Sequence, residues 1–345
     1  MVFTVFWALW VFHQARGEHR EAREAAATCL RLAETASDPG LLLQAHHAFG
    51  VSLLLVGDFA QGLRQLERGT AIYDPGQHAS LAYTYGQDSG VACLAYQGWA
   101  LWFLGYPDAA RQRTSEALAL AGRLSHPVST AAAANIACWV FQLLRQPDAA
   151  RAQAKMAVTL SSEREFEFWR AMGMVSEGWA TSEQGRLDDG IAQMRAGLSA
   201  LRSTGGEVLR PYFLSLLAQT HLRAGQVAEA LNLLEESQFA MDEGGERWWQ
   251  AELYRLKGEF SLQQNARSDE NETKAEDYFS KAHNLARDQG AKSLELRTAI
   301  SLARLWQHQG RKLEARRIVA EIYEWFSEGF ETADLQEARI LLKRL

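Results

Sequence analysis

The sequence predicts an all-α fold in which helical hairpins stack side by side into an α-solenoid. Three observations predict it. The 345 residues include only 6 prolines, about a third of the usual share, and low proline favours long helices. The string FLGYPDAAR at 103–111 returns 40 residues later as LLRQPDAAR at 143–151. Small side chains recur in step with this repeat, and no stretch shows the alternation and turn signals of β-strands.

Each predicted hairpin turns at an anchor position, which we define by Gly105. The anchors are Gly17, Gly57, Gly105, Arg145, Gly185, Gly225, Asn265 and Gly310. We expect the anchor to end the first helix of each hairpin in the left-handed conformation, which glycine adopts at least cost and asparagine tolerates. Arg145 departs from this pattern and indicates a different turn. Pro107 and Pro147 then fall in the first turn of a second helix, where proline fits.

Three columns of small residues accompany the anchors. They lie seven residues before, five after and twelve after each anchor, as Gly98, Ala110 and Ala117 do in the third hairpin. Only Trp10 and Ile322 interrupt the columns, and both belong to terminal repeats, which are expected to be atypical. We expect the small residues where helices must approach to about 8–10 Å.

The seven–five–seven spacing of the columns is typical of a tetratricopeptide-type repeat, although the period is longer than the usual ~34 residues. We therefore predict one tetratricopeptide-like domain over 1–345, a right-handed superhelix of about eight hairpins. A polar insertion at 264–273 is predicted as a loop, and a closing helix is predicted at 332–345. Such a stack buries each hairpin against its neighbours instead of forming one globular core.

Composition excludes several classes of function. Lys and Arg total 36 and Asp and Glu total 42, giving a net charge of −6. This acidic balance argues against a nucleic-acid partner and against electrostatic anchoring to a membrane. Cys29, Cys93 and Cys138 lie far apart without a CxxC pair. Neither a zinc site nor a disulfide framework is predicted, and the odd count fits a reducing, cytoplasmic location.

The first residues are apolar but do not read as a targeting segment. Residues 2–12 lack the basic start and small-residue cleavage site of a signal peptide, and they are far short of the ~20 residues of a membrane span. We interpret them as a helix without its upstream neighbour, which would leave Phe3, Phe6, Trp7 and Trp10 uncovered. Self-association through residues 1–16 is therefore predicted.

No catalytic or metal-binding motif emerges. GAKS at 290–293 lacks the glycines of a phosphate loop, and there is no HExxH. GQDSG at 86–90 has the wrong spacing for a nucleophile elbow, and it fits a helix start capped by Asp88 or Ser89. We expect no catalytic residue, no metal and no cofactor.

The tryptophans are the strongest candidates for a binding surface. Trp99, Trp139 and Trp179 recur six residues before their anchors, about 100° around the helix from the small column. Two interpretations remain open: the rings pack between successive first helices, or they line a concave groove that binds a protein or small ligand. The full set of groove candidates is Tyr96, Trp99, Trp102, Asn135, Trp139, Trp179, Tyr212 and Gln219. Further along the same face, a charged and solvated surface is expected from Arg255, Glu259, Arg297, Arg304 and His308.

Several longer strings resemble a known bacterial group. They lie at 71–110, 210–226, 246–260, 290–310 and 322–342, and include ERWWQAELYRLKGEF and GAKSLELRTAISLARLWQHQG. They are similar to the C-terminal tetratricopeptide region of predicted signalling ATPases, many of which carry an N-terminal class III adenylate/guanylate cyclase domain. The resemblance covers roughly residues 40–345. It implies a separated regulatory part whose ATPase and cyclase partners lie upstream in relatives, and no catalytic residue carries over.

The leading functional hypothesis is a non-catalytic interaction or sensor module. One alternative is a free-standing adaptor scaffold. A second alternative is an α/α-toroid enzyme, which would close its helices into a ring with paired carboxylates facing one pocket.

Overall fold

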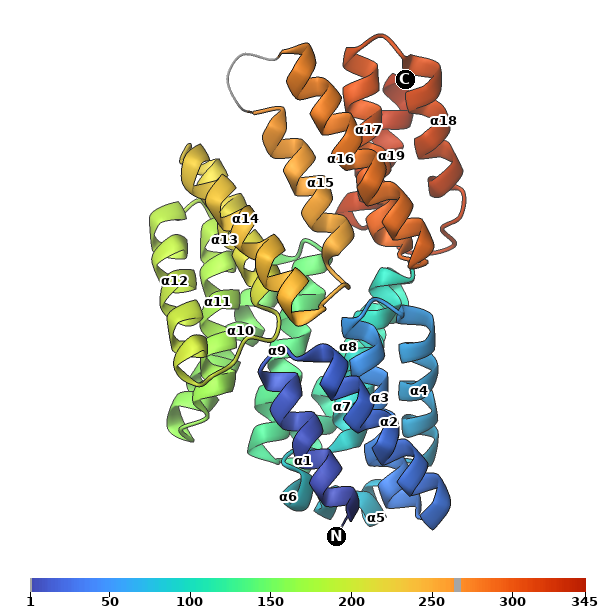
Figure 1. Ribbon diagram of the computed structural model, residues 1–345, viewed down its shortest axis with the longest axis vertical. Coiled ribbons are helices and arrows are strands. Elements are labelled where there is room, and N and C mark those ends of the chain that lie inside the picture. The colour runs from blue at the N-terminus through green and yellow to red at the C-terminus, as the bar shows by residue number, and fades with distance from the viewer. Residues whose placement is uncertain (1, 264–267) are drawn as a thin grey trace.

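The computed structural model describes residues 2–263 and 268–345, and every regular element in them is helical (Figure 1). The predicted all-α class is confirmed. The first helices of the hairpins are α1 (Val2–Ala15), α3 (Pro39–Leu55), α7 (Ser89–Phe103), α9 (Pro127–Leu143), α11 (Glu167–Glu183), α13 (Arg210–Arg223), α15 (Gln250–Ser261) and α17 (Lys292–His308). The second helices are α2 (His19–Ala36), α4 (Phe59–Ile72), α8 (Pro107–Leu124), α10 (Pro147–Glu163), α12 (Leu187–Ser203), α14 (Val227–Gly244), α16 (Asp269–Asp288) and α18 (Lys312–Tyr323). Helix α19 (Ala333–Arg344) closes the stack where the final helix was predicted.

The anchor residues turn the chain as the repeat predicts. Six anchor glycines have positive φ, between 72° at Gly17 and 87° at Gly105 and Gly185. Arg145 also has a positive φ of 57°, so the expectation of a different turn at Arg145 is wrong. The anchor at Asn265 lies outside the described residues.

The small-residue columns mark the closest helix crossings. A Cβ built on Gly178 of α11 would lie 2.9 Å from the carbonyl oxygen of Gly190 in α12, and one built on Gly190 would lie 2.6 Å from that of Gly178. Ala110 and Ala117 are fully buried. Side chains larger than these would push the paired helices apart, which is the physical reason for the recurrence.

Two irregularities of the repeat have structural explanations. The longer spacing between Gly57 and Gly105 accommodates the short helices α5 (Pro75–His78), η1 (Ala79–Leu81) and α6 (Ala82–Tyr85). The loop predicted at 264–273 is too long, because Ser268 caps α16 by accepting a hydrogen bond from the Asn271 backbone N–H at 3.2 Å. Residues 269–273 are helical, and 264–267 lie outside the described residues.

The stack winds tightly enough for one superhelical turn to rest on the next. Backbone oxygens near the ends of first helices accept hydrogen bonds from residues about 191 positions later. The pairs are Ala15 with the Glu207 N–H, Leu55 with the Arg247 N–H, and Trp102 with the Ser293 hydroxyl, at 2.8, 2.8 and 2.5 Å. The carbonyls of Ala15 and Leu55 end their helices without a partner there, so the second turn satisfies them. The Trp102 carbonyl also accepts from the Gly105 N–H at 3.1 Å. The N- and C-termini lie at opposite ends of the long axis (Figure 1).

Helix α1 is better covered than its sequence indicates. Phe3, Trp7 and Trp10 are buried, and the Trp10 indole donates to the Ser52 hydroxyl at 3.0 Å. The expectation that these three rings lack cover is therefore wrong. An apolar stripe of Val2, Val5, Leu9 and Phe12 remains 40–59% exposed on the outer side of α1. Among the described residues, no helix combines the length and apolar character needed to cross a membrane.

Candidate functional site

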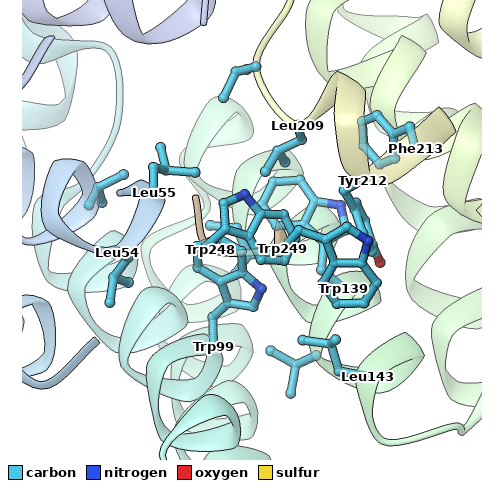
Figure 2. Packing of buried hydrophobic residues seen from close by; sticks show 14 of the residues in the cluster. Leu54, Leu55, Trp99, Trp139, Leu143, Leu209, Tyr212, Phe213, Trp248 and Trp249 are labelled. Carbon is cyan, nitrogen blue, oxygen red and sulfur yellow. The ribbon is translucent and has the colours of Figure 1, made fainter. Parts of the chain in front are cut away.

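An aromatic cluster of Trp99, Trp139, Tyr212, Trp248 and Trp249 fills the middle of the superhelix (Figure 2). The centroid of Trp248 lies 4.5 Å from that of Trp99 and 5.2 Å from that of Tyr212, and Trp99 lies 6.3 Å from Trp139. Trp248 and Trp249 stand just before α15, in the segment whose backbone N–H groups bond to Leu55. The contact between turns therefore brings these two indoles against those of α7 and α9.

Three predicted groove residues are enclosed by protein and line neither of the cavities described below. The carbonyl oxygen of Trp102 accepts from Ser293, and the Arg297 guanidinium lies 4.7 Å above the Trp102 ring. Asn135 donates to the Trp169 carbonyl at 3.2 Å, which fastens α9 to α11. The Tyr212 hydroxyl donates to Gln142 Oε1 at 2.9 Å. These side chains hold helices together.

Three other candidates line a cavity of about 120 Å³, which we call the indole cavity. Tyr96, Trp99 and Trp139 contribute to its wall. The remaining lining residues come from α1, α3, α11 and nearby loops: Trp10, Val11, Gln14, Ala15, His47, Val51, Leu55, Gln87, Phe168, Trp169, Met172, Val208 and Leu209. The cavity is thus bounded by both superhelical turns.

Trp179 and Gln219 line a larger space of about 570 Å³, which we call the inner groove. It is walled by the ends of α9, α11 and α13, by α15 and α17, and by the start of α19. Trp249 of the aromatic cluster also faces this groove, whereas Trp99 and Trp139 face the indole cavity. The two spaces share no lining residue, so the candidates predicted for one surface belong to two separate spaces or to the packing between helices.

The inner groove carries a network of ion pairs instead of the solvated charged face that was expected. Arg255 pairs with Glu252 at 2.8 Å and with Glu259 at 3.1 Å, and the Arg255 side chain is only 16% exposed. Arg297 donates to Asp334 at 2.8 Å and is 11% exposed. The expectation of a solvated face is wrong for Arg255 and Arg297, whereas Arg304 and His308 are 55% exposed.

The network continues from one superhelical turn to the other. Arg145, at the end of α9, donates to Glu337 at 2.7 Å and to Asp334 at 3.3 Å, both on α19. Arg304 pairs with the same Glu337. Arg145 therefore serves both as the anchor of its hairpin and as a contact between turns.

Two carboxylates of the groove, Glu252 and Glu337, have lowered pKa values and are held ionised. Burial opposes the charge on Glu252, but the adjacent Arg255 outweighs it and lowers the pKa of Glu252 below its ordinary value. Burial also opposes the charge on Glu337, yet hydrogen bonding from Arg145 and the charge of Arg304 lower the pKa of Glu337. A general acid needs a raised pKa, so these two carboxylates suit binding better than proton donation.

Sequence reasoning missed Trp248, Trp249 and Arg145 as parts of this region. Trp248 and Trp249 replace Val208 and Leu209 of the preceding repeat, 40 residues earlier. This swap of two aliphatic residues for two indoles was the available signal. Nothing in the sequence indicates that they meet Trp99.

The stacked helical hairpins define a tetratricopeptide-like helical-repeat fold. The sequence profile of the tetratricopeptide repeat matches residues 91–116 and 211–236, which fall on α7–α8 and α13–α14. Folds of this class are typical of protein-interaction modules.

Two curated relatives are similar in sequence. An uncharacterized protein, R02095, of Rhizobium meliloti (strain 1021) is 24% identical over 305 residues, which cover 88% of this chain and 29% of the relative. Regulatory protein AfsR of Streptomyces griseus is 28% identical over 187 residues, which cover 47% of this chain and 18% of AfsR. The matched region thus spans less than a third of the length of either relative.

Two solved structures share the fold. A Rap protein complexed with competence and sporulation factor has a TM-score of 0.62 at 11% identity, covering 99% of this chain and 96% of that one. The apo form of the quorum sensor NprR from B. thuringiensis has a TM-score of 0.53 at 12% identity, covering 94% and 86%. At these identities the likeness concerns the fold alone.

Proposed function

We propose that this chain is a non-catalytic sensor module that binds a peptide segment in the inner groove. In longer relatives it would pass this occupancy to upstream signalling domains, of the ATPase or cyclase kind that the sequence resemblance implies. Its proposed place of action is the cytoplasm, because the reducing conditions there keep cysteines such as these three as free thiols.

The inner groove is the observation that carries this proposal. It is lined by apolar rings such as Trp179 and Trp249, by amides such as Gln219, and by paired charges of both signs. A peptide offers the same mixture, with amides along its backbone and varied side chains. A single small metabolite would use only part of a 570 Å³ space.

The location of the groove explains how binding would be sensed. The groove lies between α9 of one superhelical turn and α19 of the next, where Arg145 meets Glu337. A ligand that competes for Arg145 or Arg304 changes the contact between turns. In this proposal the competition biases the winding of the superhelix, and transmission requires that the winding have two states with different affinities for the ligand.

The structural neighbours lend support of a limited kind. The Rap structure contains a bound factor, and NprR is described as a quorum sensor. Both share this fold, so a sensor function is within the range of the architecture.

The test is a selection of peptides followed by matched variants. A random heptapeptide library displayed on phage is selected on the purified chain, and the enriched peptides are synthesised and titrated by calorimetry. Arg304→Ala alters a groove residue, whereas Arg311→Ala alters an arginine paired outside the groove with Glu276 and Glu314. We expect at least a tenfold loss of affinity for Arg304→Ala and less than a twofold change for Arg311→Ala. Enriched peptides that bind both variants equally, or no peptide binding below 100 µM, would contradict the proposal (~5.5 kcal/mol of binding free energy at that limit).

The two alternatives predict different observations. A free-standing adaptor would bind the same peptides without any coupling to an upstream domain, which genomic context and a reconstituted longer relative distinguish. A toroid enzyme requires a closed ring and an acid–base pair, whereas the termini lie at opposite ends (Figure 1) and Glu252 and Glu337 have lowered pKa values. Turnover of nucleotide or sugar by the purified chain would overturn the non-catalytic proposal.

A further inference from the structure

We propose that the indole cavity is a second binding site, for an uncharged, ring-sized molecule that carries a hydrogen-bond acceptor. This proposal is independent of the peptide proposed for the inner groove, because the two spaces share no lining residue.

The size of the cavity matches a single ring. Its volume is about 120 Å³, and an apolar protein cavity of about 150 Å³ is known to admit benzene. Val11 lines the cavity and is 45% exposed, so the space reaches the surface beside α1. A ligand therefore has an entrance that requires no unfolding.

Three wall residues of the cavity carry buried polar atoms without a hydrogen-bond partner in the protein, namely Nε1 of Trp99, Nε1 of Trp139 and Oε1 of Gln14. Trp99 and Trp139 both line it, both are at least 98% buried, and neither indole Nε1 has a partner in the protein. Other buried indoles are satisfied, as Trp10 donates to Ser52 and Trp249 donates to Ser215. An unpartnered buried N–H costs free energy. A carbonyl or ring nitrogen in the cavity would recover it if a small rotation of either ring turned its N–H toward the ligand.

The wall also indicates the charge of the ligand. No Asp, Glu, Lys or Arg is among the described residues that line the cavity. Two titratable rings line it. Burial lowers the pKa of His47 to about 3 and raises the pKa of Tyr96 above its ordinary value, so both rings are neutral at physiological pH. A charged ligand would give up its hydration without gaining a counter-charge. An aromatic ketone or an uncharged nitrogen heterocycle meets all these conditions.

An occupant would touch both superhelical turns. Val51 and Leu55 belong to the first turn, and Val208 and Leu209 belong to the second. The backbone of Ala15, another wall residue, accepts hydrogen bonds from Glu207 and Val208 at 2.8 and 3.2 Å. A bound ring fills the space beside this junction, so binding is expected to raise the temperature of unfolding with ligand concentration.

The test compares three probes of nearly the same shape. Acetophenone is uncharged and has an acceptor, α-methylstyrene replaces its carbonyl oxygen by a CH₂ group, and benzoate carries a charge. Each is titrated into protein labelled with ¹⁵N at the indoles, and the signals are assigned with Trp99→Phe and Trp139→Phe. We expect acetophenone to shift the N–H signals of Trp99 and Trp139. The signal of Trp306, whose indole donates to Glu276 at 2.7 Å, should stay in place.

The expected ranking is acetophenone first, α-methylstyrene about tenfold weaker, and benzoate without detectable binding. Equal affinity for acetophenone and α-methylstyrene would overturn the proposal, because the indole donors would then contribute nothing. Absence of binding up to the solubility limit of acetophenone would also overturn it, since the cavity would then hold only water.

A matched pair of variants on α1 locates the site without disturbing the core. Val11→Trp places a large ring at the cavity mouth, whereas Leu9→Trp adds the same ring at a position that is 40% exposed and does not line the cavity. We expect Val11→Trp to weaken acetophenone binding at least tenfold and Leu9→Trp to leave it within twofold. Equal effects of the two substitutions would show that acetophenone binds elsewhere.

Discussion

Substitution of Gly190 by alanine tests the claim that the small columns exist for close helix crossings. The added Cβ would lie 2.6 Å from the Gly178 carbonyl oxygen, 2.7 Å from Ser182 Cβ and 2.9 Å from the Ser182 backbone nitrogen. Backbone atoms cannot rotate away, so α11 and α12 must separate. Overpacking of this kind costs about 1–3 kcal/mol, and the better helix propensity of alanine offsets about 0.5–1 kcal/mol of it. The two terms together leave a net loss of about 0–2.5 kcal/mol, and we expect a value near the middle of that range, about 1 kcal/mol.

Gly122→Ala is the matched control, because a Cβ at that position in α8 meets no atom within 4 Å. Only the propensity term applies, so this variant should be about 0.5–1 kcal/mol more stable than wild type. Urea unfolding followed by circular dichroism gives both midpoints. With a slope of about 3 kcal/mol per M, the midpoints should move in opposite directions by a few tenths molar. A Gly190→Ala midpoint at or above that of wild type, with Gly122→Ala behaving as expected, would refute the reasoning.

Three further outcomes are expected. Burial lowers the pKa of His47 to about 3, so below about pH 6.5 the unfolded imidazole binds a proton and the folded one does not; the free energy of unfolding therefore decreases as the pH is lowered. His47→Gln should remove about 2 kcal/mol of the loss that urea titrations measure between pH 7.5 and 5.0, and an undiminished loss would contradict this assignment. The buried Glu246 carboxylate accepts hydrogen bonds from the His19 ring, the Leu209 backbone N–H and the Trp248 indole, so Glu246→Ala should cost about 3–5 kcal/mol in urea unfolding. Arg111→Ala, at the exposed ion pair with Asp108, should cost less than about 1 kcal/mol in the same assay, and similar losses for the two variants would contradict a stabilising role of the Glu246 hydrogen bonds. Wild-type protein should self-associate in analytical ultracentrifugation through the exposed stripe of α1, and Val5→Glu combined with Phe12→Glu should give a monomer, so a monomeric wild type would disprove this contact.

The repeat architecture was predictable because its causes are local in sequence. An anchor such as Gly105 and a pair such as Gly98 and Ala110 lie within a dozen residues of each other, so their spacing records the hairpin directly. Asp88 caps α7 by accepting from the Val91 N–H at 2.8 Å, as the string GQDSG indicates. Helix starts of this kind depend on one or two neighbouring residues.

The candidate site was predictable only in part, because its geometry depends on the pitch of the superhelix. Small errors in each hairpin's rotation accumulate over a full turn, so the meeting of Trp248 with Trp99 cannot be read from spacing. The same limit explains Arg297. Its position on a first helix indicates a solvent-facing charge, but α19 of the closing turn supplies Asp334 and encloses it.

The burial of α1 has a similar explanation. Its apolar sequence indicates a face that needs cover from another part of the chain. Tyr85, from the irregular segment between α4 and α7, packs against Phe3 and Trp7 with centroids 6.0 and 5.2 Å apart. The irregular segment between α4 and α7 thus covers aromatic side chains of α1.

The hydrogen bonds that recur about 191 residues apart make this stack different from an open repeat array. In an open array each unit touches only the next, and units can be removed or duplicated with local consequences. Here the hairpins of the second superhelical turn contact particular hairpins of the first turn, so deletion of one hairpin would change the contacts of all later ones. The number of hairpins that separates two contacting units is therefore constrained, because it decides which units of the two coils meet.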